Sequence, residues 1–245
     1  MTKAVHFAAV FLILTIVSVG PAAAQDLALS LGDDGSLSAR SIQIFLLITV
    51  LSLAPGIAIM VTCFPFIVTV LSILRQAIGL QQSPPNMMMV SLAMFLTYYV
   101  MEPVFMQAWT TGVDPLLNEL IDLETAFQRT AEPFRIFMAS RLDPDTYMHL
   151  ASLRPDTVET APGPESPLSV LVPSFMLSEI ARAFQIGFLI FLPFLIIDLV
   201  VAAVLMSMGM MMVPPAIVSL PFKLSFFVIA DGWSLIAGSL VRSYF

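Results

Sequence analysis

The sequence predicts an all-α membrane protein, with two apolar helical hairpins separated by a small helical periplasmic insert. Of the 245 residues, 58% are hydrophobic and only 11% are charged, and the mean hydropathy is +0.95. A soluble domain usually carries about 25% charged residues, so this deficit is typical of a membrane protein. The charges are also unevenly placed, because 12 of the 17 acidic residues fall between positions 102 and 182. This distribution predicts one water-exposed region between two apolar ones.

Residues 1–24 have the pattern of a cleaved signal peptide. Lys3 supplies a positive start, and positions 7–19 form an apolar core of 13 residues, within the usual length of about 7–15. Small residues follow, and they predict cleavage between Ala24 and Gln25. An uncleaved anchor is the alternative, for which this core is short. Residues 25–40 are polar and predict a flexible lead.

The first apolar hairpin is expected at residues 41–101. Positions 41–74 hold no charge, and these 34 residues would measure about 51 Å as one helix, against a hydrocarbon core of about 30 Å. We therefore expect breaks at Pro55-Gly56 and at Pro65. Arg75 and the polar stretch 81–86 predict a turn, after which residues 87–101 return as a second apolar segment.

The insert at residues 102–182 and the second hairpin at residues 183–245 complete the chain. Apolar positions in the insert recur at roughly helical spacing, which predicts amphipathic helices in water. The second hairpin joins the apolar segments 183–213 and 216–244 through a Met-rich turn. Methionine is unbranched and polarizable, so such a turn would make a soft and deformable surface. Simple apolar packing at a turn is the plainer alternative.

Topology follows from the signal peptide and the sparse basic residues. Cleavage of the signal would place Gln25 outside, so Arg75, the Met-rich turn and Lys223 would face the cytoplasm, as the positive-inside rule favours. The acidic insert and Phe245 would then lie on the periplasmic side.

Charged residues interrupt the apolar sequence of the second hairpin at Asp198, Lys223 and Asp231. A lone charge at bilayer depth costs about 2.5–3.5 kcal/mol on insertion scales, so such residues usually have partners. A fold-back centred on residues 210–211 would pair Asp198 with Lys223, whereas one centred on 213–214 would place it near Asp231. Within one chain we favour the first arrangement, and pairing between neighbouring chains is equally open. Glu179 and Arg182 stand three residues apart on one helical face, where they could pair with each other or across a subunit boundary.

Several classes of function find no support in the sequence. The formal net charge is -7, without the clustered basic residues that nucleic-acid binding requires. One cysteine and two histidines offer no internal disulfide and no His- or CxxC-based metal site. No GxxxxGK[ST] motif is present for ATP, and neither membrane aspartate stands in the Gly-x-Gly-Asp setting of an aspartyl protease. We therefore expect no enzyme activity and no cofactor.

Longer motifs in both hairpins resemble the FliP family, over nearly all of the chain from about residue 42. They are LRQAIG at 74–79, PPN at 84–86, PSFMLSEI at 173–180, AFQIGF at 183–188, LPFLIIDLV at 192–200, GMMMVPP at 209–215, LPFKL at 220–224 and DGW at 231–233. One departure is the sequence FPFI at 64–67, where the family often carries Phe-Thr-Arg-Ile. A basic residue is missing there and a proline is added, which leaves the folding and contacts of the first hairpin open.

The resemblance implies a core subunit of the flagellar type III export gate in the bacterial inner membrane and flagellar basal body. It implies about five copies assembling with FliQ and FliR, with FlhB and FlhA nearby, around a pore for unfolded flagellar proteins. Much of that pore would stand above the bilayer. Carried to this chain, the resemblance assigns a pore gasket to Met210, Met211 and Met212. Independently of the resemblance, the charges discussed above make Glu179, Arg182, Asp198, Lys223 and Asp231 candidates for contacts between helices or subunits.

Two alternatives remain at this point. An injectisome export-gate subunit would share these motifs but usually lacks a cleaved signal, so the pattern at residues 1–24 favours the flagellar version. A small-solute transporter could use Asp198 and Lys223 as an ion relay, although the two hairpins show no internal repeat.

Overall fold

The computed structural model describes residues 37–80, 84–157, 160–210 and 212–245. The expected signal peptide with its Ala24–Gln25 cleavage site and nearly all of the flexible lead lie outside these residues. Within them every regular element is a helix and no strand occurs, which confirms the all-α fold class. The chain divides into two compact units, Met1–Ala54 and Pro55–Phe245.

Helix α3, Leu37–Met60, begins in the first unit and is apolar on all sides. Most of its large hydrophobic side chains from Ile42 to Leu53 are more than half exposed. The helix continues through Pro55, so the expected break at Pro55-Gly56 is wrong. Proline removes one backbone hydrogen bond, but an apolar helix in a membrane tolerates that loss. The chain instead turns at residues 61–63.

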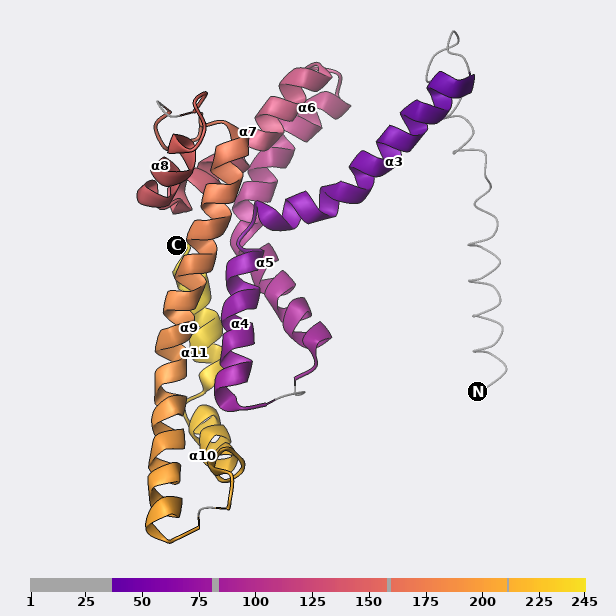
Figure 1. Ribbon diagram of the computed structural model, residues 1–245. Helices are drawn as coiled ribbons and strands as arrows, with labels where there is room; N and C mark the ends of the chain where they lie inside the picture. The colour runs from indigo at the N-terminus through magenta and orange to yellow at the C-terminus, as the bar shows by residue number, and fades with distance from the viewer. Residues whose placement is uncertain (1–36, 81–83, 158–159, 211) are drawn as a thin grey trace, which may run out of the picture. The chain divides into compact units, whose positions relative to one another are not determined.

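Helix α4, Phe64–Ile78, and helix α5, Asn86–Ala108, form an antiparallel pair in the second unit (Figure 1). Pro65 lies in the first turn of α4, where a missing N–H costs little, and thereby helps to start this helix. Gly79 ends α4 in the left-handed conformation, with φ of 89°. One face of α4 forms the centre of the larger core, through Phe66, Ile67, Val70, Leu71 and Leu74.

The middle of the chain folds into a series of helices. A π-helix at Trp109–Val113 follows α5 directly, and then come α6 at Asp114–Leu117, α7 at Leu123–Arg141 and α8 at Pro144–Ser152. A smaller core forms where α7 and α8 pack on α9, around Met138, Tyr147 and Phe175. Helix α5 runs to Ala108 and so crosses the expected boundary between hairpin and insert at residues 101–102.

Helix α9, Leu168–Ser207, has 40 residues and runs along the second unit (Figure 1). It crosses the expected boundary at residues 182–183 and contains both Pro173 and Pro193. Its closest neighbour is α4, because Gly187 has no side chain: a Cβ there would lie 2.4 Å from Cδ1 of Ile73. Ala183, one turn earlier, is fully buried.

The chain ends in α10, Pro215–Ile229, and α11, Gly232–Arg242, which meet at a bend of 62°. Asp231 stands at this bend with φ of 48°. Among the residues that the structure describes, three helical stretches are long and apolar enough to cross a membrane: Ser41–Met60, Asn86–Leu117 and Leu168–Ser207. The bent α10–α11 pair makes a fourth if it counts as one span.

Candidate functional site

The Met-rich turn joins α9 to α10 at one end of the second unit (Figure 1). Gly209 takes φ of +73°, a left-handed conformation that ends the helix with little strain. The N–H of Gly209 donates to the carbonyl of Met206 at 3.0 Å, and that of Met210 donates to Leu205 at 2.9 Å. Pro214 and Pro215 then start α10. The turn is therefore built by local backbone bonds and prolines.

Methionine side chains at this turn have little cover from their own chain. Met212 is 98% exposed, Met208 is 67% exposed and Met210 is 42% exposed. Met208 and Met210 border an apolar groove of about 590 Å³ between α9 and α10. Met211 lies outside the described residues. The structure thus brings two of the three expected gasket residues to an uncovered apolar end.

Asp198 and Lys223 face each other across α9 and α10, with 2.6 Å between Oδ2 and Nζ. Ser219 donates its hydroxyl to the other carboxylate oxygen at 2.6 Å, and Lys223 also donates to the carbonyl of Ala77 at 3.1 Å. The Lys223 side chain is 7% exposed and that of Asp198 is 32% exposed. This is the arrangement favoured above within one chain, and it ties the end of α4 to both helices of the Met-rich turn.

A second group of charges surrounds Glu179, whose side chain is fully buried in α9. Arg141 of α7 reaches Oε1 through its Nε at 3.0 Å, and Arg182 reaches the same oxygen at 3.3 Å. The hydroxyl of Tyr244 donates to Oε2. Glu179 and Arg182 therefore meet within the chain, as one of the two open alternatives expected.

Arg141 connects this group to the last residues of the chain. Its Nη1 donates to the carbonyl of Ser243 at 2.7 Å, and its guanidinium lies 4.1 Å from the ring centre of Tyr244. Burial and the neighbouring Glu179 carboxylate raise the pKa of the Tyr244 hydroxyl, so it stays protonated and keeps donating. Phe66, part of the departure at residues 64–67, packs edge-on against the same tyrosine at 5.6 Å. Phe66, which stands where the family often carries arginine, is therefore accommodated as a buried apolar side chain.

Asp231 takes no part in either group, because it lies exposed at the bend between α10 and α11. Its neighbour Gly232 is required there, since a Cβ would lie 2.2 Å from the ring of Phe227. The structure thus separates Asp231 from Asp198 and Lys223. Sequence reasoning missed Arg141, Ser219 and Tyr244, because each is an ordinary polar residue far in sequence from its partner.

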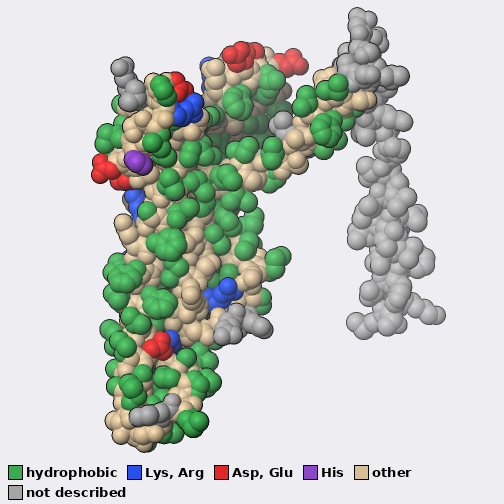
Figure 2. Space-filling model, in the orientation of Figure 1, with side chains coloured by type: hydrophobic (Ala, Val, Ile, Leu, Met, Phe, Trp, Pro, Cys, Tyr) green, Lys and Arg blue, Asp and Glu red, His purple; other side chains and the backbone are tan. Residues whose placement is uncertain are grey.

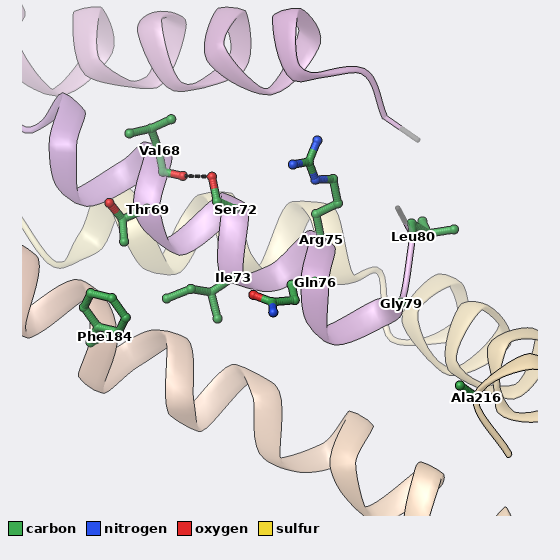
Figure 3. A pocket seen from close by; sticks show the side chains of 10 residues that line it. All are labelled: Val68, Thr69, Ser72, Ile73, Arg75, Gln76, Gly79, Leu80, Phe184 and Ala216. Atoms are coloured by element: carbon green, nitrogen blue, oxygen red, sulfur yellow. Dashed lines mark hydrogen bonds between the residues drawn. The ribbon is translucent and has the colours of Figure 1, made fainter. Parts of the chain in front are cut away.

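A groove of about 800 Å³ with a mixed polar and apolar lining follows α4 on the side that faces α9 and the start of α10 (Figure 3). Thr69, Ser72 and Gln76 lie along α4, and Phe184 stands opposite on α9. The Ser72 hydroxyl donates to the carbonyl of Val68 at 2.7 Å, so its hydrogen is already used within α4. Arg75 turns towards the start of α5 and donates to the side chain of Asn86. No set of three or more metal-ligating side chains occurs within the residues that the structure describes.

Comparison with known proteins places these features in one family. A model of the FliP family matches residues 47–240. The flagellar biosynthetic protein FliP of Agrobacterium fabrum is 56% identical over 214 residues, which cover 86% of this chain and 86% of that protein. The protein of the same name from Caulobacter vibrioides is 53% identical over 220 residues, covering 88% and 81%. That of Rhizobium meliloti is 50% identical over 240 residues, covering 96% and 98%.

Proposed function

The chain belongs to the FliP family and is a component of the flagellar type III export gate, and from this premise we propose that it supplies the pore and the pore's seal. About five copies would gather around one axis and present their Met-rich turns to it. FliQ and FliR would complete the gate, with FlhB and FlhA nearby, and unfolded flagellar proteins would pass through it. The relatives above carry the flagellar name, so the injectisome alternative is not favoured.

The observation that carries this proposal is the uncovered, uncharged end made by the Met-rich turn. No charged residue occurs between Asp198 and Lys223 in the sequence, and these two neutralise each other at the base of the turn. Met208 and Met212 leave most of their surface exposed beyond that pair. A neutral thioether surface packs against many shapes, so it can close on itself and part for a polypeptide. Nothing in this mechanism requires a reaction, and we propose that the subunit is not an enzyme.

The arrangement of the second unit supports a proposed orientation in the membrane. The turn between α4 and α5 and the Met-rich turn lie towards one end, whereas α7 and α8 lie towards the other (Figure 1). The flagellar family and the apolar helices give the chain a membrane-associated flagellar location. We propose that the first end faces the cytoplasm and that α6, α7 and α8 stand on the periplasmic side of the inner membrane. Signal cleavage between Ala24 and Gln25 is part of the same proposal.

The test is to replace the three methionines of the proposed gasket together, as Met210→Ala, Met211→Ala and Met212→Ala, in the assembled gate. Alanine removes the thioether volume without adding charge, so ion conductance through the closed gate should rise while export of flagellar proteins persists. A matched control replaces three exposed methionines of α5, Met87, Met88 and Met94, with alanine. If the conductance of the triple variant equals that of the unmodified gate, these methionines do not seal the pore.

A further inference from the structure

The end of the second unit opposite the Met-rich turn exposes a second apolar surface. It lies on residues 114–127, which run from α6 into the first turns of α7. We call this segment the acidic tip, because acidic side chains surround its apolar ones. Four large apolar side chains are two-thirds exposed or more: Leu117 at 68%, Leu120 at 75%, Leu123 at 74% and Phe127 at 69%. Leu123 and Phe127 stand four residues apart and therefore share a face of α7. Clustered exposure of this kind usually marks an interaction site.

The same residues carry a concentrated negative charge. Asp114, Glu119, Asp122 and Glu124 lie within the tip, and no Lys or Arg occurs between positions 114 and 127. Figure 2 shows acidic side chains beside apolar ones at this end of the molecule. Hydrogen bonds from Thr125 hold the pKa of Asp122 below its usual value, so its carboxylate stays ionised. The tip therefore presents apolar side chains surrounded by fixed negative charge.

Hydrogen bonds within the acidic tip fix its backbone conformation. The exposed apolar side chains are therefore held in defined positions. The side-chain amide of Asn118 donates to the Asp114 carbonyl at 2.9 Å. The backbone N–H of Leu120 donates to the carbonyl of Pro115 at 2.9 Å. Gly112 of the π-helix lets α7 approach so closely that a Cβ would lie 2.8 Å from the backbone nitrogen of Thr130. Single π-helical turns are frequent at functional sites. A preformed surface loses little conformational freedom when a partner binds.

The charge decides which partner fits. Bacterial lipid surfaces that carry anionic headgroups would repel four uncompensated carboxylates, and a second acidic tip would do the same. We propose that the acidic tip is a docking surface for another protein, one that presents apolar side chains ringed by Lys or Arg, such as a basic amphipathic helix. This inference goes beyond the pore and does not depend on the methionine seal.

The test is site-specific photo-cross-linking in cells that carry the full-length chain in assembled gates. A benzophenone amino acid replaces Leu120, and in a second strain Phe127. We expect an adduct with another protein, whose cross-linked peptide, identified by mass spectrometry, carries more Lys and Arg than Asp and Glu. A matched control site is Met148 on α8, which is 52% exposed outside the tip and should not give the same adduct.

Charge variants make the inference falsifiable without unfolding the tip. Glu119→Gln and Glu124→Gln together should lower the adduct yield about threefold or more, since each exposed charge pair contributes a small but measurable amount. The control Glu165→Gln, in the loop before α9, should leave the yield unchanged. Adducts with lipid, with a second copy of this chain or with an acidic peptide would overturn the proposal. So would a yield that is indifferent to Glu119 and Glu124, or no adduct from either tip position.

Discussion

Lys223→Met tests whether the pair at the base of the Met-rich turn stabilises the second unit. Methionine has about the length of lysine but no charge, so Asp198 would lose its 2.6 Å partner and the Ala77 carbonyl its donor. Removing one member of a buried pair costs about 3–5 kcal/mol, whereas an exposed pair contributes about 0–1 kcal/mol. The Asp198 side chain is 32% exposed and can recover some solvation. We therefore expect a loss of about 2–3 kcal/mol.

Since about 1.4 kcal/mol corresponds to a factor of ten, the ratio of unfolded to folded protein should rise about 30- to 140-fold. The assay is equilibrium unfolding of the detergent-solubilised protein, followed by its helical circular dichroism. Two controls test whether the loss comes from the buried pair. Arg154→Met breaks the exposed pair with Asp156, whose side chains are 50% and 62% exposed, and should cost less than about 1 kcal/mol. Adding Asp198→Leu to Lys223→Met removes the stranded carboxylate and should restore at least half of the loss. A Lys223→Met protein that unfolds like Arg154→Met would refute this account.

Two further predictions concern α9 and α8. Gly187→Ala should destabilise the second unit by about 1–3 kcal/mol, because the new Cβ would also lie 3.0 Å from Cγ2 of Ile73 and push α4 from α9. Gly238→Ala is the matched change on α11, with no atom within 4 Å of the new Cβ, and thermal unfolding of the two variants should move in opposite directions. Asp143 caps α8, and its hydrogen bonds hold its pKa below 3.8. Its contribution is therefore fully present above pH 3.8 and is lost as the pH falls through the lower folded value. Amide exchange at the start of α8 should accelerate over that range relative to Asp143→Asn at the same pH, and parallel curves for the two proteins would contradict this.

The turns and the pairing of Asp198 follow from local sequence. Gly209 with the proline pair at 214–215 dictates where α9 stops and α10 starts, and the length of the two helices then sets which charges meet. The helical fold class follows in the same way from an apolar composition in which backbone groups must be satisfied within each segment. These features depend on neighbours in sequence, which is why they could be predicted.

The extents of α5 and α9 could not be predicted from composition. A shift from apolar to charged residues near positions 102 and 182 indicates a change of surroundings, but it does not end a helix. Pro103 and Pro173 also stand inside helices, although proline is read from sequence as a breaker. The grouping of Glu179 with Tyr244 depends on residues that are 65 positions apart. They meet only because α4 and α7 pack on α9 and the residues after α11 reach Glu179.

The length of α9 has a consequence for how the protein exists before assembly. Forty helical residues measure about 60 Å, whereas the hydrocarbon of a bilayer is about 30 Å thick. Apolar side chains are exposed over much of this rod, from Leu177 through Phe188 to Val204. Lipid alone can shield roughly half of them, whatever the depth of insertion. A single copy therefore leaves part of the apolar surface of α9 exposed to water. In the assembly of about five copies that we propose, burial of this surface would favour early association of the subunits.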